Sequence, residues 1–216
     1  MSDTLTFRDL NAGNWEQYAG HVTESELVYP EALRTSGEEF AEVILSSGAL
    51  SKVALLDSVY IGNAVGFRMT LEEVREYGIM DLPQDASVLY ILNIVVNPGH
   101  QGKGYGHQML RELLGSARER GFSSIACHCR QTSSLGLMRQ LGAQERGIFR
   151  NWEGSGEDFV MCLLDLGSPT VAGFLSGRAR NSPSFASSQK HQASGHAGSS
   201  ESFGGFPAHD ATGSKS

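Results

Sequence analysis

The pattern of apolar and polar residues predicts a chain that alternates between strands and helices. Residues 88–96 read Val-Leu-Tyr-Ile-Leu-Asn-Ile-Val-Val, a run too uniformly apolar for an exposed edge, so they predict a central strand covered on both faces. Residues 107–120 then follow the three- and four-residue spacing of an amphipathic helix, which Gly121 ends. The apolar face of this helix carries Met109, Leu110, Leu113, Leu114 and Ala117.

Weaker patterns complete a mixed α/β domain. A Ser36-x-x-Glu39 capping box opens a second helix, and Asp57-Ser58 marks a short turn between two strands. Residues 70–85 form an insertion that is either helical or loop. The order of elements predicts a mixed central sheet of about seven strands with helices on both faces. Besides 88–96, strands are expected at 5–8, 52–56, 59–69, 124–129, 146–149 and 159–164, and helices at 14–22, after Ser36, and at 134–141.

The composition changes after Leu166 and sets the predicted domain boundary. More than half of residues 167–216 are Gly, Ser or Ala, and apolar residues such as Val171 and Phe174 are scattered singly. Such a segment buries too little apolar surface to offset the entropy lost on ordering, so it is predicted to be a disordered tail. Residues 1–166 are predicted to form a single folded domain.

Charge and cysteine content exclude several classes of protein. With 17 basic and 24 acidic residues the net charge is −7, whereas binding to nucleic acid or to an anionic membrane depends on clustered Lys and Arg. Three cysteines do not make a disulfide framework, and no run approaches the roughly 20 apolar residues that span a bilayer. The first residues lack a secretory signal. We expect a cytoplasmic monomer or homodimer without nucleic-acid or membrane partners.

A glycine-rich turn directly after the central strand carries the clearest chemical signal. Residues 97–106 read Asn-Pro-Gly-His-Gln-Gly-Lys-Gly-Tyr-Gly and lead into a helix. Without Cβ atoms at Gly102, Gly104 and Gly106, backbone N–H groups can approach a large anion, and the helix start adds unpaired amides and its dipole. Gln101 and Lys103 add a donor and a charge at the rim. The turn predicts a phosphate or pyrophosphate site, and the alternative is a helix cap without a ligand.

The turn resembles a motif of the GNAT family of N-acetyltransferases, Gln/Arg-x-x-Gly-x-Gly/Ala, whereas its spacing fits neither the P-loop nor the dinucleotide-binding fingerprint. The resemblance extends over most of residues 5–165, because the order of elements matches that fold. It implies a GNAT fold whose sheet splays apart between the fourth and fifth strands. It also implies acetyl-CoA as co-substrate, with its pyrophosphate held by the turn. The matching residues are Gln101, Gly102, Lys103, Gly104, Tyr105 and Gly106.

The same resemblance places the rest of the co-substrate along the fourth strand. The pantetheine arm is expected beside Ile94, Val95 and Val96 like an additional strand, and a backbone N–H near Val95 is expected to polarise the thioester carbonyl. A polar contact to the arm is expected from Gln131, or from Ser133 if the loop is shortened. The reaction implied is direct attack by an amine, without a covalent enzyme intermediate.

The acid and base residues common in the family are missing from this sequence. Tyr90 and Asn93 hold the strand positions at which many members carry Glu, and Met138 stands where a Tyr acid is common. His128 is the first candidate for proton transfer, because the reference pKa of histidine is about 6.5. Tyr90 is the second, as a donor to the leaving thiolate. The alternatives are a histidine satisfied within its strand and a tyrosine packed in the core.

The triplet Cys127-His128-Cys129 raises the question of a metal site. Strand alternation sends the two sulfurs to one face and the imidazole to the other, so the three cannot share an ion. Cys162 adds a third cysteine, which is still short of the four ligands of a structural zinc site. No metal site is therefore predicted, and Cys127 is interpreted as a small core residue rather than a nucleophile.

An acidic segment between the first two helices is a candidate acceptor site. Glu24, Glu26, Tyr29 and Glu31 would suit a cationic amine, although an acidic surface loop without function has the same composition. An α-amino group, with a pKa of about 7.7–8.0, needs less help with deprotonation than a lysine at about 10.4. Residues 149–152 and 157–161 resemble the end of bacterial enzymes that acetylate ribosomal-protein N-termini.

The leading hypothesis is an acetyl-CoA-dependent N-acetyltransferase that acts on a primary amine. A peptide or protein amine is the preferred acceptor, and a small-molecule amine is the alternative. A second hypothesis is a catalytically degenerate module that binds CoA as a sensor or as an interaction surface, which the missing acid and base favour. A third is transfer of a longer acyl group, which depends on the depth of the pocket.

Overall fold

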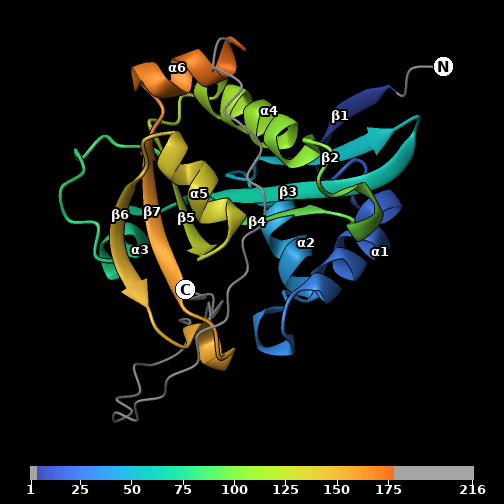
Figure 1. Ribbon diagram of the computed structural model, residues 1–216, viewed down its shortest axis with the longest axis horizontal. Coiled ribbons are helices and arrows are strands. Elements are labelled where there is room, and N and C mark those ends of the chain that lie inside the picture. The colour runs from blue at the N-terminus through green and yellow to red at the C-terminus, as the bar shows by residue number, and fades with distance from the viewer. Residues whose placement is uncertain (1–3, 178–216) are drawn as a thin grey trace, which may run out of the picture. The chain divides into compact units, whose positions relative to one another are not determined.

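The computed structural model describes residues 4–177, which build a mixed seven-stranded sheet (Figure 1). Across the sheet the strands follow the order β1-β2-β3-β4-β5-β7-β6. The neighbours β4 and β5 run parallel, and the other described pairs run antiparallel. This arrangement confirms the predicted mixed α/β class. The strands are β1 (Leu5–Leu10), β2 (Ser51–Leu56), β3 (Val59–Met69), β4 (Val88–Val96), β5 (Ser124–Arg130), β6 (Gln144–Phe149) and β7 (Phe159–Asp165).

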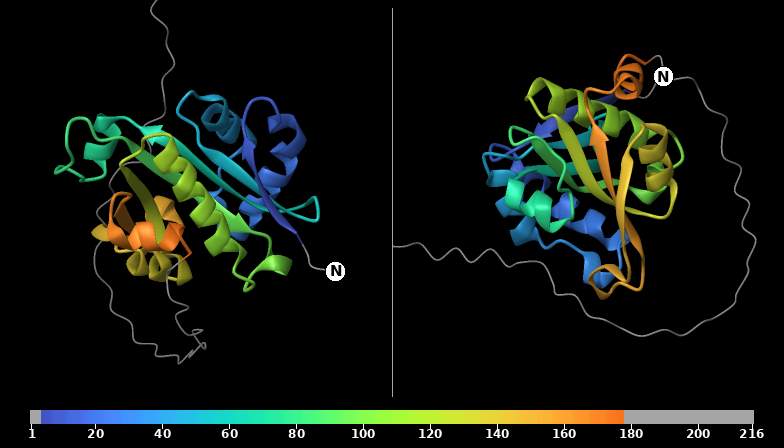
Figure 2. Two further views of the ribbon diagram at one scale, coloured as in Figure 1. Left: turned by 90° about the horizontal axis from the view of Figure 1, so that it is seen from above. Right: turned by 90° about the vertical axis from the view of Figure 1, so that its left-hand side faces the viewer.

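Helices cover both faces of the sheet, as predicted. Figures 1 and 2 show α1 and α2 on one face, and α4, α5 and α6 on the other. The insertion between β3 and β4 contains the short helix α3 followed by a loop. None of the described helices is long and apolar enough to cross a membrane. The helices are α1 (Trp15–Ser25), α2 (Gly37–Leu45), α3 (Leu71–Glu76), α4 (Tyr105–Glu119), α5 (Ser133–Gln140) and α6 (Pro169–Leu175).

Apolar clusters on the two faces fix these layers. On the α4 face, Leu113 packs in one cluster with Leu89 of β4 and Ile125 of β5, and all three are fully buried. On the α1 face, Phe40 of α2 packs in a second cluster with Val65 of β3. The residues that α4 buries are the same ones predicted from sequence to form its inner face. The apolar spacing therefore identified the contact surface of this helix.

Two local predictions are confirmed at the level of backbone geometry. The Ser36 hydroxyl accepts the N–H of Glu39 at 3.2 Å, and the Glu39 carboxylate accepts the N–H of Ser36 at 2.7 Å, which completes the capping box of α2. Asp57 and Ser58 have φ angles of 49° and 70°. Left-handed conformation at both central residues is typical of the tight turn that joins two twisted antiparallel strands, here β2 and β3.

The folded domain extends beyond the boundary predicted at Leu166. Helix α6 is capped by the Ser168 hydroxyl, which accepts the N–H of Val171 at 3.3 Å. Val171 and Phe174, interpreted from sequence as scattered tail residues, are buried in the core on the α4 face. Two apolar residues three positions apart form one helix face, but this pattern is too short to stand out in a Gly-rich composition. The prediction of a disordered tail was therefore wrong for residues 167–177. The remainder of the predicted tail, 178–216, lies outside the described residues.

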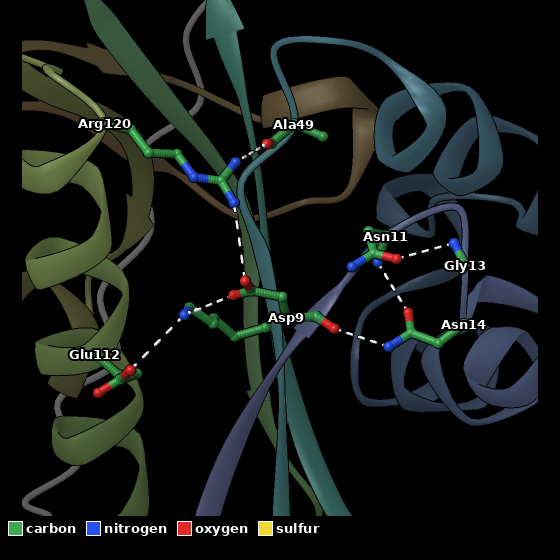
Figure 3. A network of polar contacts seen from close by, with 8 residues as sticks. Asp9, Asn11, Gly13, Asn14, Ala49, Glu112 and Arg120 are labelled. Carbon is green, nitrogen blue, oxygen red and sulfur yellow. Dashed lines mark hydrogen bonds and ion pairs between the residues drawn. The ribbon is translucent and has the colours of Figure 1, made fainter.

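Ion pairs tie the edge of the sheet to α4, and Figure 3 shows Asp9, Glu112 and Arg120, which take part in them. Lys52 of β2 is 7% exposed, and its Nζ lies 2.7 Å from the Asp9 carboxylate of β1 and 3.7 Å from that of Glu112 of α4. Arg120 lies 4.0 Å from the same Asp9 carboxylate and donates to the Ala49 carbonyl at 2.8 Å. A buried ammonium is costly unless it is paired, so these contacts hold α4 against β1 and β2.

A β-bulge in β4 determines which of its side chains face α4. The register between β3 and β4 skips Leu92, so this residue is an insertion in the strand. Before the bulge, Leu89 and Ile91 belong to the core on the α4 face; after it, Ile94 and Val96 pack against that core. The extra residue shifts the strand alternation by one position. Asn93, directly after the bulge, consequently turns toward the α1 side, where it contacts Glu26.

Candidate functional site

Strands β4 and β5 pair over only three residues, which confirms the predicted splay. Val88, Leu89 and Tyr90 pair with residues 124–126, and the pairing ends there. A cavity of about 330 Å³ follows, lined on one side by Ile91 and Ile94 of β4 and on the other by residues 127–130 of β5. It shares lining residues with an adjoining cleft of about 1280 Å³. Two ligands approaching from different sides can therefore meet at the splay.

The backbone of β4 offers unpaired groups to this cavity. The N–H of Asn97 donates to a carbonyl of β3 at 2.8 Å. Backbone groups of a strand point alternately to its two neighbours, so the N–H of Val95 also faces β3, whereas those of Ile94 and Val96 face the side on which β5 has separated. The donors expected near Val95 are thus those of its two neighbours, and not the N–H of Val95 itself.

The glycines of the turn have different roles: two of them suit the backbone conformation, and the third leaves space at the start of α4. Gly102 and Gly104 have φ angles of 75° and 82°, a region that other residues rarely adopt, so the backbone conformation favours glycine at both. Gly106 lies in the first turn of α4, and a Cβ there would come no closer than 3.8 Å to another atom, in Val96. The fold therefore does not require glycine at position 106. Its missing side chain leaves the unpaired amides at the start of α4 open to the cleft.

The side chains at the rim of the turn contact its own backbone. Gln101 lines the cleft, and its Nε2 donates to the Val96 carbonyl at 2.8 Å. This contact agrees with a Val96 backbone that faces the open side of β4. Lys103 is exposed, and its Nζ donates to the Gly99 carbonyl at 3.3 Å. Tyr105, the first residue of α4, also lines the cleft.

Polar residues directly after β5 line the cleft. Gln131 is exposed, and among the described residues of this loop the cleft is lined by Thr132 and Ser134. Ser133 begins α5. Met138 of α5, which stands at the position of a Tyr acid in many family members, lines the smaller cavity. A thioether has no proton to donate, so Met138 cannot act as an acid.

Tyr90 of β4 and His128 of β5 form a hydrogen-bonded pair at the splay. The Tyr90 hydroxyl lies 2.8 Å from Nδ1 of His128. His128 lines the smaller cavity, and its Nε2 is buried with no hydrogen-bond partner among the described residues. Tyr90 lies behind it and is 5% exposed. The structure therefore joins two residues that the sequence singled out separately.

Aromatic rings enclose His128. The Trp152 ring stacks on the imidazole at a centroid distance of 4.1 Å, and Phe149 and Tyr77 approach it edge-on at 4.6 Å and 5.0 Å. Burial lowers the pKa of His128 from its usual 6.5 to about 3, so the ring is neutral at physiological pH. Burial likewise raises the pKa of Tyr90 well above its usual value. The reference pKa assumed for His128 from sequence therefore does not hold in the folded protein.

Two of these rings come from segments whose role the sequence does not reveal. Tyr77 follows α3 in the insertion. Trp152 lies between Asn151 and Glu153, whose φ angles of 46° and 51° are in the left-handed region. Non-glycine residues adopt this region at an energetic cost, and here the conformation brings Trp152 back onto His128. In the sequence, only the glycines of the β6–β7 connection indicated that the backbone turns sharply near Trp152.

The acidic segment at the end of α1 and directly after it lines the same cleft as the glycine turn. Glu24 and Tyr29 contribute to this wall together with Tyr60 of β3, which the sequence analysis did not single out. The guanidinium of Arg130 lies 4.9 Å from the centre of the Tyr29 ring and forms an ion pair with Glu157 at 2.8 Å. Arg130 thereby links the acidic segment to the β6–β7 connection. The expected acceptor segment thus reaches the cleft.

Glu26 belongs to the same acidic segment, but its side chain is buried behind the cleft wall and not exposed in the cleft. It is 3% exposed, with one carboxylate oxygen accepting Asn93 Nδ2 at 2.7 Å and the other accepting the N–H of Thr35 at 3.0 Å. Burial raises its pKa above the usual value of 4.5. From sequence, Glu26 is indistinguishable from the exposed carboxylates beside it, because a loop residue gives no sign of a partner 67 positions away.

The three cysteines lie in the core on the α4 face. The sulfurs of Cys127 and Cys129 are 3.5 Å apart, which confirms that strand alternation sends both to one face, and Cys162 of β7 lies opposite Cys127 of β5 in the sheet. The hydrogen bond with Cys127 raises the pKa of Cys129, and the hydrogen bond with Cys129 raises the pKa of Cys162. The thiols of Cys129 and Cys162 are therefore not activated as nucleophiles. Residues 4–177 contain no group of three or more His, Cys, Asp or Glu side chains arranged to hold a metal ion.

Comparison with known proteins agrees with this geometry. The model of the family described as "Acetyltransferase (GNAT) family" matches residues 22–143. The N-alpha-acetyltransferase RimI of Mycobacterium tuberculosis is 36% identical over 78 residues, which cover 36% of this chain and 49% of that protein. The chain thus matches about half the length of this relative.

Solved structures share the fold. The ribosomal-protein-S18-alanine N-acetyltransferase of Escherichia coli superposes with a TM-score of 0.58 at 19% identity, covering 76% of this chain and 96% of that one. NAA60 of Arabidopsis thaliana in complex with acetyl-CoA gives a TM-score of 0.63 at 14% identity, covering 76% and 100%. A GNAT family acetyltransferase of Elizabethkingia anophelis with acetyl-CoA bound gives 0.53 at 18% identity, covering 76% and 99%. At these identities the likeness establishes the fold.

Proposed function

We propose that this chain, which belongs to the acetyltransferase (GNAT) family, moves an acetyl group from acetyl-CoA to the α-amino group at the N-terminus of a peptide or protein. The observation that supports this most directly is the arrangement at the splay. Unpaired backbone groups of β4 lie between an anion-binding helix start and the Tyr90–His128 pair. A thioester lying along β4 and an amine entering from the acidic wall would meet there.

The residues on one side of the site fit acetyl-CoA. The unpaired amides at the start of α4, left open at Gly106, suit a diphosphate. Ile94 and Val96 present backbone groups to an arm lying along β4, and Thr132 and Ser134 supply hydroxyls on the facing wall. Two of the structural relatives hold acetyl-CoA. Acetyl-CoA supplies an activated acetyl group, so that a C–N bond forms, the C–S bond breaks, and the proton lost by the amine ends on the thiol.

Tyr90 and His128 are the residues positioned to move this proton. At physiological pH the low pKa of His128 keeps the imidazole neutral, and the high pKa of Tyr90 keeps the hydroxyl protonated. When Nδ1 donates to the Tyr90 oxygen, Nε2 carries a lone pair; when Tyr90 donates to Nδ1, Nε2 carries the proton. The pair can thus hold a proton at either end, which suits transfer from nitrogen to sulfur.

The weak basicity of His128 favours an α-amine as acceptor. An imidazole with a pKa of about 3 cannot deprotonate a lysine ammonium, whereas a substantial fraction of α-amino groups is already neutral near their pKa of about 7.7–8.0. The acidic wall at Glu24 suits a nitrogen that is cationic on arrival. The relative from Mycobacterium tuberculosis is named an N-alpha-acetyltransferase.

A screen with labelled acetyl-CoA tests the proposal. The acceptors are peptides with free N-termini, the same peptides with a blocked N-terminus and an internal lysine, polyamines and aminoglycosides. We expect label on the free N-termini and none on the blocked peptides. Labelling of lysine or polyamines alone would overturn the α-amine assignment. Binding of acetyl-CoA without transfer to any amine, at neutral and at alkaline pH, would favour the catalytically degenerate CoA-binding module.

A further inference from the structure

A buried carboxylate lies directly behind the acceptor wall of the cleft. Glu26 is 3% exposed, yet Ser25 before it and Tyr29 after it both line the cleft, and its partner Asn93 lines the cavity at the splay. Among the described residues no cationic side chain lies within ion-pair distance of Glu26. Its charge therefore lies one hydrogen bond behind the wall of that cavity and has no ion-pair partner in the described part of the chain, and only the more distant, exposed Arg34 attracts it.

Glu26 is the end point of a chain of hydrogen bonds that begins at the cleft wall. The Tyr60 hydroxyl donates to the Asn63 amide oxygen, Asn63 Nδ2 donates to the Asn93 amide oxygen at 2.9 Å, and Asn93 Nδ2 donates to Glu26 at 2.7 Å. The N–H of Thr35 donates to the second carboxylate oxygen at 3.0 Å. Every donor points toward the carboxylate, so the surroundings match its ionised form; a protonated carboxyl would have to donate its own hydrogen.

A buried carboxylate without a cation costs stability, and its hydrogen bonds offset only part of that cost. Uncompensated charges of this kind concentrate at functional sites. An amine acceptor would bring a positive charge close to Glu26 at two stages. Its nitrogen arrives in solution as an ammonium, and it gains positive charge again when the neutral amine attacks a carbonyl carbon. A fixed negative charge near the nitrogen stabilises both states relative to a neutral ligand.

We propose that Glu26 is a positioning residue that recognises the positive charge of the acceptor nitrogen through the wall formed by Asn93 and Tyr60. This inference rests on the proposed function and deepens it, because it defines the acceptor class as amines that are protonated in solution. The same hydrogen bonds fasten residues 26–35 to β4. Glu26 therefore determines both the charge of the acceptor site and the position of its wall.

The test compares a charged and a neutral form of one ligand. The ligand is a peptide acceptor from the labelling screen, with its N-terminus either free or acetylated, and calorimetry measures its affinity for the protein saturated with CoA. We expect Glu26→Gln to weaken binding of the free peptide about tenfold and of the acetylated peptide less than about twofold, as loss of one charge interaction predicts. Glu42→Gln, at an exposed position of α2, should change neither affinity.

Equal weakening of both peptides in Glu26→Gln, or no weakening of either, would overturn the inference, since a purely structural role does not distinguish the two forms. The wild-type protein provides a test that needs no variant to fold. It should bind the free peptide more tightly than the acetylated one, and equal affinities would also overturn the inference. If no peptide is acetylated, the proposed function fails, and the same comparison with butylamine and N-butylacetamide decides the role of Glu26 independently.

Discussion

The Tyr90 hydroxyl and Nδ1 of His128 are 2.8 Å apart at the point where two parallel strands cease to pair. Tyr90 is the last residue of β4 in register with β5, and His128 lies two residues beyond its partner Ala126. The hydrogen bond thus continues the contact between the strands after the backbone pairing has ended. It fixes the imidazole at the start of the cavity.

Removal of the Tyr90 hydroxyl tests whether the pair acts as a unit. We expect Tyr90→Phe to lower kcat by roughly 100-fold, the lower end of the range for general acid–base groups, and to leave the affinity for acetyl-CoA unchanged. The Tyr90→Phe/His128→Gln double variant should lose little more than either single variant, because both disrupt one proton path. Steady-state kinetics measure these losses. Tyr18→Phe removes a buried hydroxyl of α1 outside the site and is the control; additive losses would contradict a shared role.

The pH dependence of the rate should follow the acceptor and not His128. With a pKa of about 3, His128 stays neutral throughout the working range, so the rising limb of kcat/KM should reflect deprotonation of the substrate amine. Two peptides whose N-terminal amines differ in pKa should give limbs displaced by that difference. A limb that stays near the reference histidine pKa of about 6.5 with both peptides would show that His128 titrates there.

The buried imidazole also predicts how stability depends on pH. In the unfolded chain His128 takes up a proton at a pKa of about 6.5, whereas in the folded protein it does so only at about 3. As the pH falls through this interval the unfolded state binds the proton first, so the free energy of unfolding decreases; above the interval His128 contributes no pH dependence. His128→Gln should flatten the curve of melting temperature in this acidic window. A difference between variant and wild type that is constant with pH would refute the expectation.

Gly106 offers a test of the anion site that leaves the fold unchanged. Gly106→Ala places a methyl group over the open start of α4, where the diphosphate would lie, and should weaken acetyl-CoA binding about tenfold or more. Gly115→Ala, in the same helix but away from the cleft, should leave this affinity unchanged. In a helix each substitution should preserve or raise stability, by up to about 1 kcal/mol. Calorimetric titration with acetyl-CoA distinguishes them, and equal affinities would remove the cofactor from this turn.

The contribution of α6 is measurable by truncation. A chain that ends at Leu166 loses Val171 and Phe174 from the core, which should lower the free energy of unfolding by roughly 3–6 kcal/mol. A chain that ends at Gly177 keeps both side chains and should melt close to the full chain. Thermal unfolding of the two truncations decides the question. Similar melting temperatures for both would show that α6 adds no stability to the domain.

Sequence predicted the elements that a local pattern determines. The bounds expected for β4 agree with the structure, because a nine-residue apolar run has few other stable arrangements in a soluble domain. The Ser36–Glu39 box and the Asp57-Ser58 turn were predicted for the same reason, since each depends on residues within four positions. The glycine turn was placed correctly between a strand and a helix.

Features that depend on tertiary contact were not predictable in this way. The pKa of His128 is set by rings from three other segments, and the environment of Glu26 is set by a strand far along the chain. Trp152 reaches its position through a backbone conformation that its residue types disfavour. Phe174 is buried by a two-turn helix whose composition resembles a linker. In each case the feature depends on contacts between residues that are far apart in the chain or on a backbone conformation that the local sequence disfavours.

The inserted Leu92 puts the upper part of β4 out of phase with its lower part. A strand of the same nine residues without the bulge would alternate regularly through Leu92, turn the side chains of Ile94 and Val96 away from α4, and exchange the backbone groups that point toward β3 for those that point away. The glycine turn would then follow a strand whose last side chains and backbone groups point in the opposite directions. Transplanting this turn onto another scaffold therefore requires the irregular strand as well, because the bulge determines which side chains and backbone groups of β4 face the turn.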